Sequence, residues 1–178
     1  QKLLLFLSIL FLLSSCDTPA EPQEVVINDQ YKILVPLSLK PGTELNADAS
    51  LQYQNLYEEL YIVVIDESEE GFLEALVNND LDSLYNNDLT GYSDLLLMGI
   101  TMELKNKPQG TVKDTIINGL EARTTDMEVS IDGFGIYYKL AYLKGAEDFY
   151  QIMTWCMAEQ KEKHASTMDA MIYSFEEL

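Results

Sequence analysis

Apolar residues along this chain fall into two patterns, one typical of β-strands and the other of α-helices. Residues 31–35, 51–56 and 60–65 are apolar-rich runs near turn residues, which predicts three strands early in the chain. The third run, Leu-Tyr-Ile-Val-Val-Ile, is typical of a strand that is buried on both faces. Such a strand requires another layer on each side of its sheet, so we expect helices to follow.

Helical periodicity predicts two helices in the middle of the chain. Ser68 followed by two glutamates is typical of a helix start, and an apolar stripe follows at Phe72, Leu73, Leu76 and Val77. Residues 78–91 are rich in Asn and Asp, which predicts an irregular connection. A second helix is expected to end before Pro108, with its apolar stripe at Leu95, Leu96, Met98, Gly99 and Met102.

Residues 111–157 predict a four-stranded antiparallel meander. Turn signals at Asn118-Gly119, Asp132-Gly133 and residues 144–147 separate four runs that are rich in β-branched and aromatic residues. Alternation gives the last three strands an apolar inner face, formed by Thr125, Met127, Val129, Ile131, Phe134, Ile136, Tyr138, Leu140, Tyr142, Phe149, Met153 and Trp155. A closing helix over residues 159–173 is expected to lie across this sheet through Met168, Met171, Ile172 and Phe175.

The start of the chain has the pattern of an export signal. Lys2 precedes an apolar run over residues 3–13 that contains one serine. A membrane-spanning helix needs about 20 apolar residues, so this run is too short for a permanent transmembrane anchor. We therefore expect the run to be removed during export.

The order Leu13-Ser14-Ser15-Cys16 resembles the lipobox of bacterial lipoproteins. The resemblance implies a lipoprotein signal peptide over residues 1–15 and a lipid on Cys16, the first mature residue; an ordinary secretory signal with an incidental cysteine is the alternative. Each buried methylene contributes about 0.8 kcal/mol, so several acyl chains would hold the protein on a membrane. We expect residues 16–30 to form the lipidated cysteine and a flexible tether, and residues 31–178 to form one domain.

Composition narrows the range of partners. The 178 residues carry a formal charge of −19, and without Lys2 ten basic residues remain against thirty acidic ones. Such a charge repels phosphate backbones, so we expect no nucleic-acid partner. With Cys16 lipidated, Cys156 is the remaining thiol, so no intramolecular disulfide is expected and packing must hold the core.

The predicted order of elements resembles the PsbP-like and DcrB-like domains over residues 31–178. The similar features are an early strand pair, the long buried strand, the hairpin start Asn118-Gly119-Leu120-Glu121-Ala122, a long strand over 150–156 and a final helix ending Ile172-Tyr173-Ser174-Phe175. The resemblance implies an α+β fold: an α/β/α sandwich with a largely antiparallel sheet flanked by helices. These domains occur in exported and lipid-anchored bacterial proteins and in an extrinsic subunit of photosystem II, mostly in accessory roles. The resemblance transfers no functional residues.

Two acidic segments resemble sites but fit structural roles better. Asn86, Asp88, Thr90 and Gly91 match early positions of a calcium loop, yet Leu97 stands where the loop needs a bidentate Glu. An Asx-rich turn is the better interpretation. The acids Asp66, Glu67, Glu69 and Glu70 could supply paired carboxylates, but acids between a strand and a helix are typical of a solvated cap. We expect no metal and no cofactor.

The remaining candidates are a thiol, an imidazole and four tyrosines. Cys156 has no neighbouring base and is expected to be an inert buried hydrophobe. His164, the single histidine, lies beside the final apolar stripe and is expected to be structural. No nucleophile can be paired with it, so we expect no enzyme activity. Tyr137, Tyr138, Tyr142 and Tyr150 are expected to line a ligand groove.

Two functions fit these observations. The first is a membrane-tethered envelope lipoprotein that acts as a non-catalytic binding or accessory module for an unidentified partner or small ligand. The alternative is an envelope hydrolase that uses carboxylates only, which would need two acids facing each other across a pocket. The expected location is the bacterial cell envelope, with the choice between inner and outer membrane left open.

Overall fold

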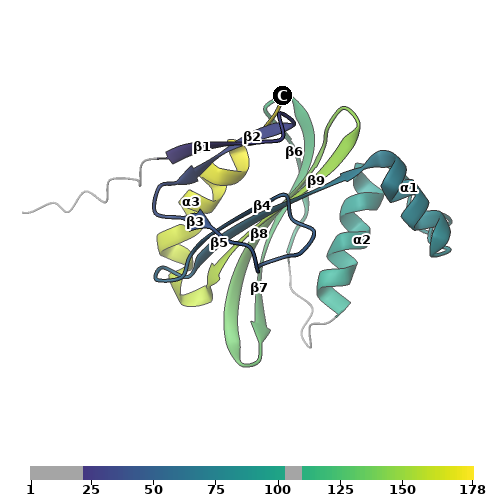
Figure 1. Cartoon of the computed structure of the whole chain (residues 1–178). Helices are drawn as coiled ribbons and strands as arrows, with labels where there is room; N and C mark the ends of the chain where they lie inside the picture. The colour runs from purple at the N-terminus through teal and green to yellow at the C-terminus, as the bar shows by residue number, and fades with distance from the viewer. Residues whose placement is uncertain (1–21, 103–109) are drawn as a thin grey trace, which may run out of the picture.

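A seven-stranded antiparallel sheet forms the middle layer of the fold (Figure 1). The computed structural model describes residues 22–102 and 110–178, so the expected lipid site at Cys16 lies outside the described residues. The strand order is β3-β4-β5-β9-β8-β7-β6. In chain order the strands are β3 (Lys40–Pro41), β4 (Leu51–Asn55), β5 (Leu60–Ser68), β6 (Lys113–Ile117), β7 (Leu120–Ile131), β8 (Phe134–Lys144) and β9 (Asp148–Met157).

Strands β6 to β9 form the predicted meander, and two of its turns have the geometry that their residues favour. Asn118 and Gly119 have φ values of 46° and 91°, and Asp132 and Gly133 have values of 51° and 89°. Two successive positive φ values match the twist of adjacent antiparallel strands, and Asn-Gly and Asp-Gly tolerate them. The turn residues therefore fix the register of both hairpins.

Strand β5 joins the meander through β9 rather than through a neighbour in sequence, with Tyr61 opposite Trp155 and Ser68 opposite Asp148. Ile62, Val63 and Val64 are fully buried although successive side chains of a strand point to opposite faces. The prediction that this strand is buried on both faces is confirmed.

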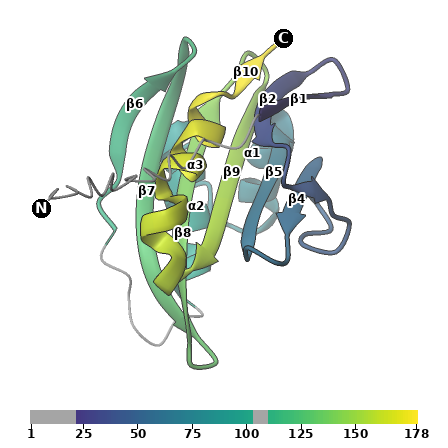
Figure 2. The ribbon, with the colours of Figure 1, turned by 90° about the vertical axis from the view of Figure 1, so that its left-hand side faces the viewer.

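Different elements cover the two faces of the sheet (Figure 2). Helix α3 (Lys161–Tyr173) lies on one face, after the short 3-10 helix η1 (Ala158–Gln160). A small three-stranded sheet made of β1 (Pro22–Ile27), β2 (Tyr31–Pro36) and β10 (Glu176–Glu177) lies beside it. Helices α1 (Glu69–Asn78) and α2 (Leu89–Met102) lie on the other face. This is the expected α/β/α sandwich.

Each face has its own aromatic-rich core. In the core under α3, Tyr31 stacks on Phe175 with ring centroids 5.0 Å apart, and Tyr150 packs 5.6 Å from Tyr31. In the core under α1 and α2, Tyr92 stacks on Phe149 at 4.7 Å, and Phe72 meets Tyr92 edge-on at 5.1 Å. The cores hold the layers together without a disulfide among the described residues, where Cys156 is free.

The faces differ from the expected arrangement in one respect. The apolar face that includes Met127, Val129 and Leu140 packs under α2, whereas Met168 and Ile172 of α3 pack on the opposite face. Strands β8 and β9 are therefore largely buried on both faces, because both of their alternating side-chain sets are mostly apolar.

Two element boundaries also differ from the sequence-based expectation. Pro22–Ile27 forms β1, which pairs with β2, so the domain includes residues that were assigned to the tether. Helix α2 begins at Leu89 rather than near Leu95, and it buries its first turns through Leu89, Tyr92 and Ser93. Of the expected stripes, Leu73, Val77, Met98 and Met102 are exposed. No helix within residues 22–102 or 110–178 has the length and apolar character needed to cross a membrane.

Candidate functional site

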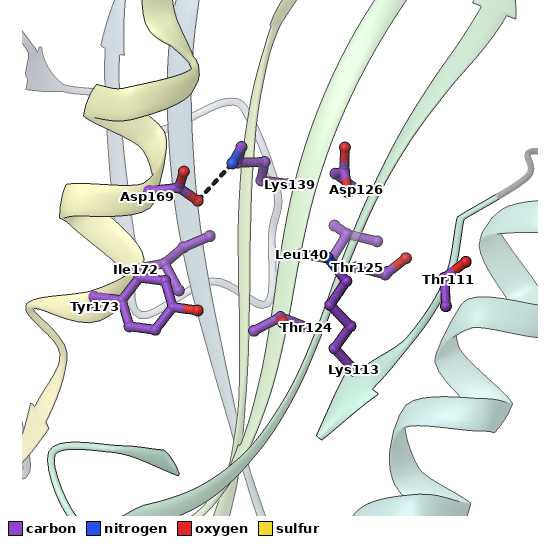
Figure 3. Close-up of a pocket in the computed structure, with 10 residues that line it drawn as sticks. All are labelled: Thr111, Lys113, Thr124, Thr125, Asp126, Lys139, Leu140, Asp169, Ile172 and Tyr173. Carbon is purple, nitrogen blue, oxygen red and sulfur yellow. Dashed lines mark hydrogen bonds and ion pairs between the residues drawn. The ribbon is translucent and has the colours of Figure 1, made fainter. Parts of the chain in front are cut away.

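A polar cavity of about 260 Å³ lies between α3 and the β6–β7–β8 end of the sheet (Figure 3). Strand β6 pairs with residues 120–124 of β7, and its first residue Lys113 stands opposite Thr124. Before Lys113 the chain leaves the sheet, which leaves space beside the next residues of β7. The lining residues are Thr111, Lys113, Thr124, Thr125, Asp126, Lys139, Leu140, Asp169, Ile172 and Tyr173.

An ion pair between Lys139 of β8 and Asp169 of α3 forms one wall of this cavity. The Lys139 Nζ and Asp169 Oδ1 atoms are 2.5 Å apart, and the lysine side chain is 16% exposed. Its strand neighbours on this face, Tyr137 and Ala141, are buried in the core. A charge that is this shielded from water requires a partner, and Asp169 supplies it from the helix.

Asp126 stands opposite Lys139 on the neighbouring strand and interacts with Tyr137. The Tyr137 hydroxyl donates a hydrogen bond to Asp126 Oδ2 at 3.2 Å. Burial, followed by the nearby Asp126 charge, raises the pKa of Tyr137 well above its usual range, so the phenol remains a donor. Lys161 lies over the same ring at 4.5 Å and pairs with Glu128 at 2.8 Å.

Several polar groups in the cavity are not engaged by other described residues. Thr125 is 7% exposed, and its Oγ1 has no hydrogen-bond partner within the part of the chain that the structure describes. In Figure 3 this hydroxyl points towards Thr111. A methyl group at Gly110 would lie 2.6 Å from it, so glycine keeps space open beside the oxygen. Lys113 is in no ion pair among the same residues.

This arrangement is suited to binding a small polar molecule. The cavity presents two ammonium groups, two carboxylates and several hydroxyls, but Asp169 is paired with Lys139 and Asp126 accepts from Tyr137. A buried hydroxyl without a hydrogen-bond partner has lost its bonds to water and gained none in return. A ligand atom could supply the missing hydrogen bond. Within residues 22–102 and 110–178, no three His, Cys, Asp or Glu side chains form a group that could hold a metal ion.

The four tyrosines of the expected groove do not lie together. Tyr137 and Tyr150 are buried in the core under α3, whereas Tyr142 is buried in the core under α1 and α2. Tyr138 is partly buried on the same side as Tyr142. Tyr137 and Tyr138 point to opposite faces of the sheet, one into the core under α3 and the other towards the core under α1 and α2. The tyrosine-groove prediction is wrong.

The first acidic segment spans the end of β5 and the start of α1, so Asp66 and Glu67 belong to the strand and Glu69 and Glu70 to the first turn of the helix. The Ser68 side chain accepts a hydrogen bond from the Gly71 amide at 3.0 Å, and Glu69 pairs with Lys144. Asp88 accepts a hydrogen bond from the Gly91 amide at 2.8 Å at the start of α2. Burial raises the pKa of Glu67 above its usual value. The potential calcium position Asp88 therefore serves as a helix cap.

Cys156 and His164 are both packed inside the domain. Burial raises the pKa of the Cys156 thiol to about 11, and its Sγ lies 4.0 Å from the Met168 sulfur. His164 is 3% exposed, and burial, followed by the nearby Lys163 charge, lowers its pKa below the ordinary value. Both residues thus have the structural surroundings that were expected.

Sequence analysis missed the residues that line the cavity, although one signal was present. Lys139 interrupts a face of β8 on which Tyr137, Ala141 and Leu143 are buried. A lysine at such a position predicts a partner of opposite charge from the covering helix. Thr125 carried no comparable signal, because threonine is common in strands.

Solved structures with the same arrangement of elements include a cyanobacterial PsbP protein from Synechocystis. It superposes with a TM-score of 0.61 at 13% identity, over 93% of this chain and 99% of that one. The fold is PsbP-like. A Pseudomonas aeruginosa protein of unknown function, described as a putative regulator, matches with a TM-score of 0.52 at 10% identity, over 87% and 96% of the two chains.

A Bacteroides thetaiotaomicron protein also contains this arrangement, with a TM-score of 0.53 at 8% identity, over 90% of this chain and 49% of that one. No protein-family model and no curated protein matches the sequence. At these identities the structural similarities show the PsbP-like fold, and the chemistry of the cavity has to be argued from its own residues.

Proposed function

We propose that this PsbP-like domain is a non-catalytic binding module, held in the cell envelope by a lipid on Cys16, and that its polar cavity binds a small ligand. The observation that carries this proposal is the buried Thr125 hydroxyl, which has no hydrogen-bond partner among the described residues and lines the same cavity as the Lys139–Asp169 pair. Isolated buried polar groups are uncommon in folded proteins, and a cavity next to one provides room for its partner.

The charges of the cavity indicate what kind of ligand would fit. Lys113 could bind an anionic group, and Asp126 retains acceptor capacity beyond the bond from Tyr137. The two positive and two negative side chains favour a ligand with both charges. At about 260 Å³ the cavity lies below the range of about 300–1,000 Å³ that is typical of drug-sized ligands. The matching class is a zwitterion of amino-acid size.

Binding should be tested by calorimetry on the Cys16→Ser variant with a panel of free amino acids. Thr125→Val removes the hydroxyl at nearly constant shape. Lys113→Gln removes the positive charge of Lys113, which is in no ion pair among the described residues. We expect each change to weaken binding about tenfold, the effect of losing one hydrogen bond of about 1.4 kcal/mol. Lys40→Gln, on a strand outside the cavity, is the matched control. Equal binding by all variants would contradict the cavity assignment.

The tether is tested separately by fractionating bacterial cells. We expect the wild-type chain to sediment with membranes and Cys16→Ser to be recovered in the soluble fraction, because the lipid supplies the membrane affinity. A variant that is still cleaved before position 16 and remains bound to the membrane would contradict lipid anchoring.

A carboxylate-only hydrolase is the second candidate, because Asp126 and Asp169 both line the cavity. Such an enzyme should turn over glycan or ester substrates and lose this activity in Asp126→Asn or Asp169→Asn. Turnover with this mutational pattern would replace the binding proposal.

A further inference from the structure

An apolar groove of about 340 Å³ lies between β1–β2 and α3, away from the polar cavity. Its lining residues are Pro22, Leu34, Pro36, Ser166, Thr167, Ala170 and Met171. Pro36 and Met171 are buried, whereas Pro22 and Ala170 are exposed and Leu34 is 37% exposed. The groove thus combines a buried apolar floor with an accessible rim.

The walls of this groove are fixed to each other by hydrogen bonds. Ser174, directly after α3, accepts a bond from the Leu34 amide at 2.9 Å and donates to the Met171 carbonyl at 2.7 Å. On the other side, Pro22 stands opposite Pro36 in the β1–β2 pairing. The groove is therefore part of the folded scaffold, and its size corresponds to the lower end of small-molecule sites.

The position of Pro22 decides which occupant we favour. Pro22 is both a wall of the groove and the first described residue, and six Cα–Cα steps separate it from Cys16. An extended chain spans at most about 3.3–3.6 Å per residue, so Cys16 is held within roughly 20 Å of Pro22. An acyl chain attached at Cys16 therefore remains at high effective concentration beside an apolar groove.

We propose that this groove binds an acyl chain of the lipid on Cys16. The inference rests on the proposed lipid anchor and adds a binding site for it within the domain. A chain held in the groove is withdrawn from the bilayer, which draws the domain towards the membrane surface. The ligand class is a single hydrocarbon chain, because five of the seven lining residues are apolar and none is charged.

The first test uses methyl-labelled methionine and compares the lipidated protein in dodecylmaltoside micelles with the Cys16→Ser variant. We expect the Met171 methyl resonance to differ between the two forms. Met153, which packs on the other face of the sheet, should give the same resonance in both. Mass spectrometry of the same sample establishes whether Cys16 carries the lipid.

The second test titrates the soluble Cys16→Ser variant with palmitate. We expect a saturable shift of the Met171 resonance, and at least tenfold weaker binding in Ala170→Glu, which places a charge at the exposed rim. Leu56→Glu is the matched control, because Leu56 is 70% exposed on the β4–β5 turn, outside the groove.

The outcomes separate this inference from the anchor itself. An unmodified Cys16 overturns both proposals. A lipidated Cys16 with an unchanged Met171 resonance, or palmitate binding that is equal in Ala170→Glu, overturns the groove assignment and leaves the anchor intact. A Met171 resonance that depends on protein concentration in the Cys16→Ser variant assigns the groove to a second copy of the chain and overturns the inference.

Discussion

Asn118 in the β6–β7 turn donates a hydrogen bond from its side-chain amide to the backbone carbonyl of Phe175 at 2.7 Å. The same Nδ2 atom lies 3.1 Å from the Tyr173 carbonyl. One residue therefore closes a hairpin at the edge of the large sheet and holds the C-terminal end of α3. These two roles can be separated by mutation.

We expect Asn118→Gly to lower the free energy of unfolding by about 1 kcal/mol. Glycine retains the positive φ of the turn, so the loss reports the hydrogen bonds to the end of α3. Asp132→Gly makes the comparable change in the β7–β8 turn and is the control, with an expected effect within about 0.5 kcal/mol. Urea unfolding of both variants measures the difference, and equal stabilities would show that the side-chain bonds contribute nothing.

Arg123 of β7 links α2 to the sheet through hydrogen bonds and an ion pair. Its guanidinium contacts Asp94 at 2.7 Å, the Thr90 carbonyl at 3.2 Å and the buried Ser93 hydroxyl. Arg123→Lys keeps the charge but cannot make this set of contacts, so we expect a loss of about 2 kcal/mol and faster amide exchange in α2. Asp114→Asn should change stability by less than about 0.5 kcal/mol, because Asp114 is 88% exposed. Unchanged amide exchange in Arg123→Lys would contradict this role.

Leu73 and Leu76 test which part of the apolar stripe of α1 is in the core. Leu76 is 1% exposed, so Leu76→Ala should cost about 2–5 kcal/mol through lost burial and a residual cavity. Leu73 is 43% exposed, and Leu73→Ala should stay within about 0.5 kcal/mol. Thermal unfolding of the two variants distinguishes them, and similar losses would place Leu73 in the core as well.

His164 should make the protein less stable as the pH falls below about 6.5. Its folded pKa is lowered by burial, so below the ordinary value the unfolded chain binds the proton first and unfolding becomes more favourable. The loss accumulates until the pH reaches the folded pKa. His164→Gln removes this contribution, so its urea midpoint should fall less than that of the wild type between about pH 7.5 and pH 5. Parallel pH profiles would show that His164 does not titrate differently on folding.

Cys156 should be unreactive while the domain is folded. Burial raises the pKa of its thiol to about 11, which leaves roughly one thiolate in a thousand molecules at pH 8. In the Cys16→Ser variant we expect negligible reaction with Ellman's reagent in buffer and a full equivalent in denaturant. Rapid labelling of the folded protein would show that this part of the core opens readily.

The sequence predicted those parts of the fold that depend on local chemistry. Asn118-Gly119 and Asp132-Gly133 fix hairpins through their own backbone preferences, and Ser68 caps α1 as expected. Which helix covers which face was not predictable in this way, because β8 carries apolar residues on both faces. That choice depends on contacts between residues that are distant in sequence.

Even less of the cavity than of the fold could be predicted from the sequence. Lys139 and Asp169 are thirty positions apart, and their pairing depends on where α3 crosses the sheet. The tyrosines were misassigned because aromatic residues are common in strands whether they bind a ligand or fill a core. Which role a tyrosine has depends on the side chains that the neighbouring layer places against it. The local sequence does not contain this information.

The strand order of the large sheet also determines when the domain can fold. Strand β5 needs β9 as its neighbour, and β2 pairs with β10 at the far end of the chain. A chain that emerges N-terminus first therefore keeps β4 and β5 without their central partner until almost all of it has appeared. Long-range pairing of this kind slows folding. Folding of the large sheet therefore has to wait until β9 is available to pair with β5.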